Sequence, residues 1–223
     1  MKGYYARKVH SLLGLVPLSL FLIEHAITNY AAFDGGQEGF RDAVRTLNDL
    51  PLVFFLELFA IWLPLLFHGV YGLYIAYQAQ PNLGHFKTER NWRFVLQRVS
   101  GVIAFVFIIW HVYTTRFQIT LGNTTHDELG GFMHNIVTQP GFFIFFLVGV
   151  IATTFHFANG VWAFLVSWGI TVGPRAQRIS SYACMGLFLI VTTLFMLSLF
   201  AFRGEEFADT ASVITTTLQT LIG

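Results

Sequence analysis

Half of the histidines in the sequence stand inside long apolar runs: His25, His68, His111 and His156. An imidazole in a membrane-spanning run is costly to bury, so each of these residues suggests a functional role. A single such histidine could be a neutral side chain that hydrogen-bonds to a neighbouring helix. Four consecutive runs with one histidine each make that explanation less favoured. The remaining histidines lie near run ends or in connections, where a solvated or interfacial position suffices: His10, His85, His126 and His134.

The composition is that of a chain solvated by lipid. Of the 223 residues, 55% are hydrophobic and 11% are charged, whereas a soluble domain carries about 25% charged residues. The net charge of +1 gives no reason to expect nucleic-acid binding. The single cysteine, Cys184, excludes an intrachain disulfide and a Cys-x-x-Cys-His attachment site for a c-type haem.

Five apolar runs are long enough to cross a membrane, which takes about 20 residues of helix. They are residues 11–32, 52–78, 97–121, 141–168 and 181–202. We therefore expect an all-α integral membrane protein with five transmembrane helices, forming a single domain over residues 1–223. The basic residues set its orientation, because nine of the 13 lie in the N-terminal segment, 79–98 and 169–180. The positive-inside rule then predicts a cytoplasmic N-terminus and a C-terminus outside.

The depths of the four histidines sort them into two pairs. His25 and His111 each lie about 14 residues from the inner end of an outward-running helix, or about 21 Å at 1.5 Å per residue. His68 and His156 lie about 10 to 12 residues before the inner ends of inward-running helices, or about 15 to 18 Å from that surface. The sequence thus predicts an outer pair, His25 with His111, and an inner pair, His68 with His156.

Paired imidazoles at two depths are typical of haem ligation. Imidazole is a common axial ligand of haem iron, and two of them favour electron transfer over oxygen binding. We expect the first four helices to bundle around two stacked b haems, the distal one on the outer pair and the proximal one on the inner pair. Zinc or di-iron sites gather their ligands at one point, usually with Cys or carboxylates. A proton relay of histidines usually includes acidic residues, and few are available here.

Glycines on the predicted helices also fit haem. Gly14 lies 11 residues before His25 and, at about 100° per residue, on nearly the same helical face. Gly101 lies ten residues before His111. A helix that carries a distal ligand must pass the proximal haem, and a glycine would let it clear the macrocycle. Ordinary close packing between membrane helices is the alternative.

Several motifs follow one another along the chain: Arg7-Lys8-Val9-His10-Ser11-Leu12-Leu13-Gly14, Phe21-Leu22-Ile23-Glu24-His25, Leu63-Pro64-Leu65-Leu66-Phe67-His68-Gly69, Leu96-Gln97-Arg98-Val99-Ser100-Gly101, Trp110-His111-Val112, Phe155-His156-Phe157 and Gln177-Arg178-Ile179-Ser180. In this order they resemble the dihaem cytochrome b anchor of succinate:menaquinone oxidoreductases, in the succinate dehydrogenase and fumarate reductase family. The resemblance covers nearly the whole chain and is strongest to the Bacillus-like type.

The resemblance implies a subunit of respiratory complex II in a bacterial cytoplasmic membrane. A flavoprotein with FAD and an iron–sulfur subunit would dock on its cytoplasmic side. Electrons from succinate would pass through the proximal and then the distal haem b to menaquinone near the outer face. The axial histidines of the family fall on His25, His68, His111 and His156, in the same pairs. No succinate-oxidising site is expected on this chain, which has no cysteine set for clusters and no dinucleotide fingerprint.

Quinone reduction takes up protons, so a carboxylate near the quinone is expected. Glu57 lies 11 residues before His68, nearly on the same face and further out, and is our candidate proton carrier. Glu24 is a weaker candidate. The residues Arg98, Arg7 and Arg178 lie near inner helix ends, where they could contact haem propionates or merely lipid headgroups.

Other functions remain open at this point. The dihaem subunit of a quinol:fumarate reductase would run the same chemistry in reverse. Another quinone-reactive cytochrome b, of the hydrogenase or formate dehydrogenase type, also uses transmembrane histidines. The order of the motifs along the whole chain argues against it. A haem-free anchor or a transporter is a further alternative. The sequence shows neither the inverted repeat nor the pair of Gly/Pro-broken helices that are expected of a transporter.

Overall fold

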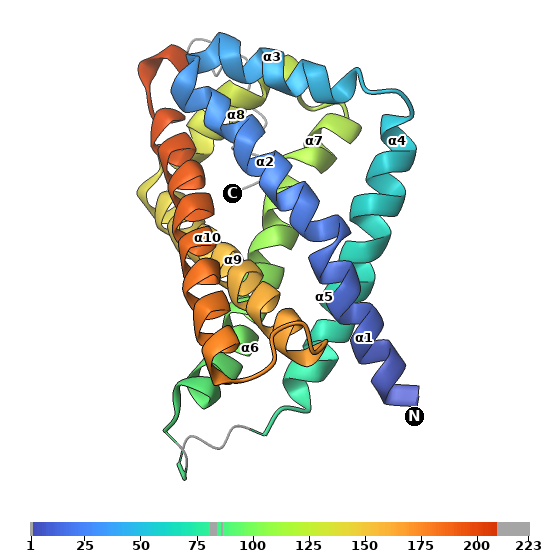
Figure 1. The fold of residues 1–223 in the computed structure, drawn as a ribbon. Helices are drawn as coiled ribbons and strands as arrows, with labels where there is room; N and C mark the ends of the chain where they lie inside the picture. The colour runs from blue at the N-terminus through green and yellow to red at the C-terminus, as the bar shows by residue number, and fades with distance from the viewer. Residues whose placement is uncertain (1, 81–83, 86, 209–223) are drawn as a thin grey trace. The chain divides into compact units, whose positions relative to one another are not determined.

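The computed structural model describes residues 2–80, 84–85 and 87–208, and every regular element in these residues is a helix (Figure 1). Five of the helices are long and apolar enough to cross a membrane: Gly3–Asp34, Val53–Tyr77, Glu89–Thr120, Pro140–Ser167 and Pro174–Ala201. The expectation of an all-α, multi-pass membrane protein is confirmed. The predicted exit of the C-terminus on the outer side falls on residues 209–223, which lie outside the described residues.

The spans are built from the following elements. The first comprises α1 (Lys2–Leu15) and α2 (Pro17–Asp34), and the second comprises α4 (Val53–Leu56), the π-helix η1 (Glu57–Trp62) and α5 (Leu63–Tyr77). The third comprises α6 (Glu89–Thr114) and α7 (Arg116–Thr120), and the fourth and fifth are α9 (Pro140–Ser167) and α10 (Pro174–Ala201). Between and after the spans lie α3 (Gly36–Asn48), η2 (His126–Glu128), α8 (Leu129–Val137) and η3 (Glu205–Phe207).

Three of the helices begin earlier than the apolar runs predicted. The first, third and fifth spans extend toward the N-terminus beyond residues 11, 97 and 181. The added turns carry basic residues, among them Arg7, Arg93 and Arg178. Long basic side chains lay their methylene stems along an apolar helix while the charged head reaches water, so a helix continues past its apolar core. Hydropathy therefore located these spans but not their first turns.

Pro17 divides the first span. A proline ring provides no N–H and clashes with the carbonyl four residues earlier, so helical hydrogen bonding is interrupted there. Close to this interruption, the hydroxyl of Ser19 donates to the carbonyl of Gly14 at 2.9 Å. α1 ends at Leu15 and α2 starts with Pro17 as its first residue, the position where a missing N–H costs least.

Pro64 has a comparable effect on the second span. Its ring would crowd the carbonyl of Ala60 in an α-helix, and the preceding residues, Glu57 to Trp62, form a π-helix instead. A π-helix bonds residue i to i+5 and so takes up more residues per turn than an α-helix. Residues before Leu63 therefore do not keep α-helical spacing relative to His68. The prediction that Glu57 shares a face with His68, made from 100° per residue, does not hold through this segment.

The described residues group into two compact units. The first unit contains the described residues within 2–23, 54–105 and 151–192, and in it α1 packs along α5 (Figure 1). The second unit contains residues 24–53, 106–150 and 193–208. The single domain expected over residues 1–223 stays a prediction.

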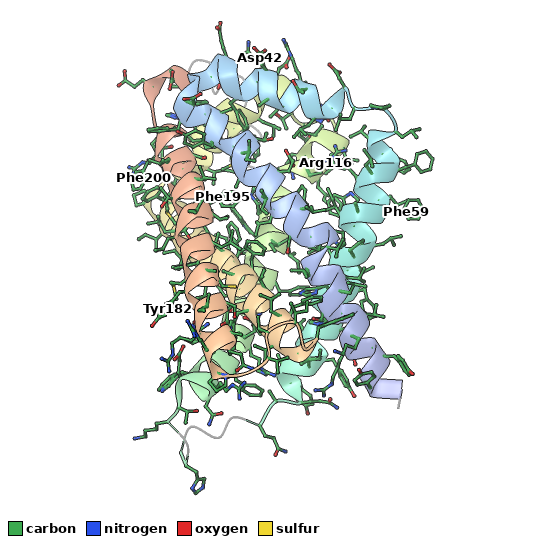
Figure 2. The ribbon with its side chains drawn as sticks, in the orientation of Figure 1. Asp42, Phe59, Arg116, Tyr182, Phe195 and Phe200 are labelled. Carbon is green, nitrogen blue, oxygen red and sulfur yellow. The ribbon has the colours of Figure 1, made fainter. Side chains whose placement is uncertain are left out.

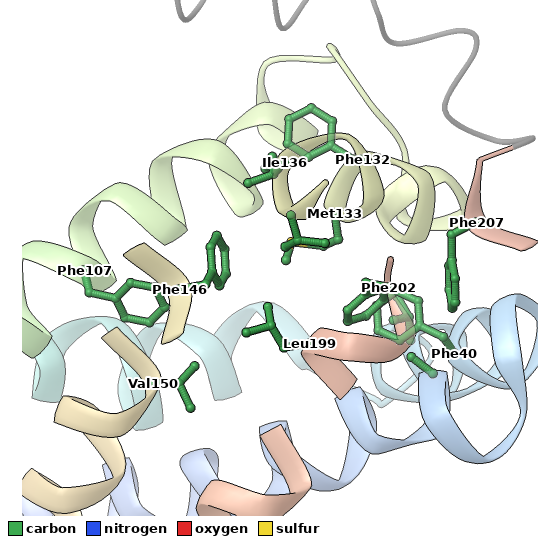
Figure 3. Packing of buried hydrophobic residues seen from close by; sticks show 13 residues of the cluster. Phe40, Phe107, Phe132, Met133, Ile136, Phe146, Val150, Leu199, Phe202 and Phe207 are labelled. Carbon is green, nitrogen blue, oxygen red and sulfur yellow. The ribbon is translucent and has the colours of Figure 1, made fainter. Parts of the chain in front are cut away.

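The second unit has a tightly packed aromatic core, drawn in Figure 3. The amphipathic helix α3 buries Phe40 and Val44 against α8 and the chain that follows α10. The ring of Phe202 packs edge-on against Phe40 and Phe207, with centroids 4.9 Å and 5.2 Å away. Gly36, with φ of +61°, allows the sharp turn between α2 and α3 because glycine lacks a Cβ.

A surface ion pair also joins parts of the second unit. The guanidinium of Arg45 donates two hydrogen bonds to the carboxylate of Asp127, at 2.8 Å and 2.7 Å, and lowers the pKa of that carboxyl. Both side chains are about half exposed, so solvent screens the interaction. An exposed pair of this kind contributes little to stability.

Large apolar side chains also cover the exterior of the spanning helices. Phe59, Tyr182 and Phe200 project away from the helices that carry them and are exposed (Figure 2). Such a surface would be a liability in water but is expected where lipid is the solvent.

We predict that Phe202→Ala destabilises the second unit by about 3–5 kcal/mol, because it opens a cavity where three aromatic rings meet. The measurement is the apparent melting temperature of the detergent-solubilised chain. Phe200→Ala, two residues away on an exposed position, is the matched control and should leave the melting temperature nearly unchanged. Equal losses in the two variants would show that the ring of Phe202 is not part of a packed core.

Candidate functional site: two histidine pairs

The first unit brings His68 of α5 and His156 of α9 together. Their imidazole centroids lie 6.1 Å apart with an interplanar angle of 81°. Nδ1 of His68 lies 2.9 Å from the carbonyl oxygen of His10, and Nδ1 of His156 lies 2.9 Å from that of Gln97. A carbonyl only accepts, so both contacts favour the tautomer with the proton on Nδ1 and the lone pair on Nε2. The amide Nε2 of Gln97 also lies 3.2 Å from Nδ1 of His156. In the favoured tautomer each ring keeps one nitrogen that is able to bind a metal.

A chain of side-chain hydrogen bonds leads away from His156. Nε2 of Gln97 donates to the carbonyl of His156 at 3.0 Å, and Nδ2 of Asn159 donates to Oε1 of Gln97 at 2.6 Å. The guanidinium of Arg93 donates to Oδ1 of Asn159 at 3.3 Å and to the hydroxyl of Ser181 at 2.5 Å. Arg93 also pairs with Glu89 and lies over the ring of Trp162. These bonds tie α6, α9 and α10 together next to the ligand.

His10 lies closer to this site than the sequence suggested. We expected a solvated or interfacial position, but its ring stacks on that of His68, with centroids 4.1 Å apart and planes 7° apart. Its Nε2 is buried and has no hydrogen-bond partner among the described residues. The position of His10 near the start of an apolar run gave no sign of this contact.

The second unit brings His25 of α2 and His111 of α6 together. Their centroids lie 6.0 Å apart with an interplanar angle of 65°. The ring of His111 stacks on Phe107 and meets Phe146 edge-on, while Phe195 lies against His25. Nδ1 of His111 is buried and unpaired within the described part of the chain. Aromatic rings therefore line both imidazoles of this pair.

Polar residues one turn further along the same helices hydrogen-bond to the backbone carbonyls of this second pair. Nδ2 of Asn29 donates to the carbonyl of His25 at 2.8 Å. The hydroxyl of Thr115 donates to the carbonyl of His111 at 2.6 Å, and α6 ends at the preceding residue. Side chains that bond backward in this way often bend a helix. The third span breaks at Thr115, four residues after His111.

Both pairs have the spacing of imidazoles that share one metal. A metal–imidazole bond is about 2 Å long, so rings on opposite sides of one metal have centres about 6 Å apart. The measured separations are 6.0 Å and 6.1 Å. Among the described residues, no three His, Cys, Asp or Glu side chains converge on one point. The donor set of each site is thus two imidazoles, which fits an axially ligated haem.

The three predicted propionate contacts differ in their positions. Arg98 is partly buried, donates to the carbonyl of Phe94 at 2.6 Å, and has a buried Nε that no described acceptor reaches. It also lies within electrostatic reach of Arg7, an exposed residue. Two cations close together, one with an unused donor, are suited to bind an anion. Arg178 is exposed and is not brought near them by any described contact.

The two candidate carboxylates lie in different units. Glu57 is partly buried at the start of the π-helix in the first unit. Glu24 belongs to the second unit and is the immediate neighbour of His25. Its carboxylate accepts a hydrogen bond from the hydroxyl of Thr28 at 2.5 Å.

The chain is similar to known membrane anchors over most of its length. The family model described as succinate dehydrogenase/fumarate reductase transmembrane subunit matches residues 76–196. The succinate dehydrogenase cytochrome b558 subunit of Bacillus subtilis (strain 168) is 44% identical over 201 residues, which cover 90% of this chain and 98% of that relative.

We predict that Asn159→Ala lowers the stability of the chain by about 1–3 kcal/mol, because Gln97 and Arg93 lose a buried hydrogen-bond partner. Thermal unfolding in detergent measures the effect. Asn48→Ala is the control, since that amide donates only to the carbonyl of Val44 in its own helix. A melting temperature as high as that of the control would mean that the network contributes little.

Proposed function

Because the chain belongs to the family of succinate dehydrogenase/fumarate reductase transmembrane subunits, we propose that it anchors the enzyme in the membrane and passes electrons to menaquinone through two b haems. The observation that carries this proposal is the presence of two imidazole pairs, each about 6 Å across, on four of the spanning helices. Such pairs leave no coordination position for oxygen, which suits electron transfer.

The residues fit two axially bound haems. His68 and His156 would hold the proximal haem, and His25 and His111 the distal one. Bound haem supplies one-electron redox chemistry at each pair. The chain itself would orient the imidazoles and line the second pair with the rings of Phe107, Phe146 and Phe195.

Arg98 and Arg7 are the favoured propionate contacts. The unused Nε of Arg98 and the neighbouring charge of Arg7 both support binding of a carboxylate. Arg178, which is exposed, fits contact with lipid headgroups or a partner subunit at least as well.

The dehydrogenase chemistry belongs to partner subunits in this proposal. A flavoprotein with FAD and an iron–sulfur subunit would bind on the cytoplasmic side, which the positive-inside rule assigns to the basic N-terminal end. Menaquinone would be reduced near the outer face, where a carboxylate must deliver protons. Glu57 remains our candidate for that role. The same residues could serve a quinol:fumarate reductase, since the family includes both enzymes and the direction depends on potentials set outside this chain.

Haem quantification tests the two pairs directly. The purified wild-type chain should contain two protohaems by pyridine haemochrome, and His25→Ala and His68→Ala should each lose a different one, as seen in reduced-minus-oxidised spectra. His85→Ala, outside the spanning helices, is the control and should retain both. One haem or none in the wild-type chain would reject the dihaem proposal.

The role of Glu57 is tested by Glu57→Gln in the assembled complex. Loss of a general acid should slow menaquinone reduction by about 10²–10⁴-fold, while both haems remain bound and succinate still reduces an artificial acceptor. Glu205→Gln, an exposed carboxylate, is the control. Unchanged menaquinone reduction in Glu57→Gln would show that Glu57 does not deliver the protons. Glu24 would then be the next residue to replace.

A further inference from the structure

Each imidazole of the first-unit pair lies directly against a glycine of another helix. A Cβ placed on Gly14 would lie 2.8 Å from Nδ1 of His68 and nearer still to its Cε1. A Cβ on Gly101 would lie 2.7 Å from Cε1 and 3.0 Å from Nδ1 of His156. Real Cβ atoms essentially never come this close to another heavy atom, so any larger residue would have to displace the ring.

The glycines and the accepting carbonyls have the same spacing on both helices. Nδ1 of His68 donates to the carbonyl of His10, four residues before Gly14, and Nδ1 of His156 donates to the carbonyl of Gln97, four residues before Gly101. In an α-helix the carbonyl of residue i bonds to the N–H of residue i+4, whose Cβ leans back toward it. A carbonyl oxygen has two lone pairs, and glycine at i+4 leaves the second one accessible from the side.

Other glycines of the first unit show that this arrangement is not ordinary packing. Gly69 lies against the ring of Phe105, and Gly160 against the side chain of Gln97. A Cβ on Gly186 would have no heavy atom of another residue within 4 Å beyond its own helix backbone and chain neighbours. Only Gly14 and Gly101, among the glycines that the structure describes in this unit, contact an imidazole of the pair.

We propose that His10-x-x-x-Gly14 and Gln97-x-x-x-Gly101 are two matching seats for the ligand imidazoles. Each seat combines a carbonyl that accepts the Nδ1 proton with a glycine that makes room for the ring. Together they fix His68 and His156 in the tautomer whose Nε2 faces the haem iron. Gly14 and Gly101 are thus positioning residues, and this inference rests on the proposed function because it needs haem at the pair.

The seats also affect the redox equilibrium. A hydrogen bond from Nδ1 to a carbonyl makes the imidazole a more basic ligand, and a more basic ligand stabilises ferric iron. Loss of that bond therefore favours reduction. The second-unit pair provides an internal comparison, because Nδ1 of His111 has no hydrogen-bond partner among the described residues.

The test uses Gly14→Ala and Gly101→Ala in the full chain assembled with its partner subunits. The haem that is lost in His68→Ala should change its low-spin ferric EPR signal in both variants. Its ratio of reduced to oxidised form at fixed potential should rise about tenfold, which equals about 59 mV for a one-electron couple. The haem that is lost in His25→Ala should keep its signal and its potential. Selective loss of the first haem alone would equally support the seats.

Gly186→Ala is the matched control and should leave both haems unchanged. Wild-type signals and potentials in both test variants would overturn the inference. If neither variant accumulates, pulsed EPR of the wild-type complex decides: remote-nitrogen couplings of hydrogen-bonded imidazoles support it, and couplings of unbonded imidazoles refute it. Fewer than two haems in the wild-type chain would instead reject the proposed function, so the two failures are distinguishable.

Discussion

The cost of placing imidazoles in hydrocarbon is the constraint on which the rest of the structure depends. A polar group in lipid must find its partners within the protein, because no water is available. The first-unit pair meets this demand through main-chain carbonyls, with His68 bonded to His10 and His156 to Gln97. In the second-unit pair, Nδ2 of Asn29 lies 3.3 Å and 3.4 Å from the ring nitrogens of His25. Nδ1 of His111 has no hydrogen-bond partner among the described residues and is surrounded by aromatic rings. The two pairs therefore meet this demand to different degrees.

Irregularities in three spans lie close to the histidines. Pro17 breaks the first span eight residues before His25, and Pro64 follows a π-helix four residues before His68. The third span breaks at Thr115, four residues after His111. Where a proline, a π-helix or a break interrupts a helix, the residues on either side need not keep regular 3.6-residue spacing. The positions of these histidines therefore depend on local departures from the α-helix as well as on the helix itself.

Because of these irregular helical segments, the sequence predicted the depth of a residue along its helix better than the direction in which its side chain points. Hydropathy was sufficient for five spans, and counting residues inward from their ends was sufficient to pair His25 with His111 and His68 with His156. Depth along a helix is robust, because each residue adds nearly the same rise. The direction in which a side chain points around the helix axis is harder to predict, because one π-helix changes that angle for every residue beyond it. The angular prediction for Glu57 failed for that reason, and no pattern in the sequence indicated that the ring of His10 would stack on His68.

The positions of two glycines show how the spans contribute to each other's sites. Gly14 and Gly101 lie against the imidazoles of His68 and His156, and their expected role in clearing a macrocycle stays a prediction. The second and fourth spans thus provide the ligands of the first-unit pair, and the first and third provide its carbonyls and glycines. The first and third spans also carry His25 and His111. Each of these two spans therefore carries a histidine of one pair together with a carbonyl and a glycine that contact the other pair, so a substitution in either span can affect both pairs.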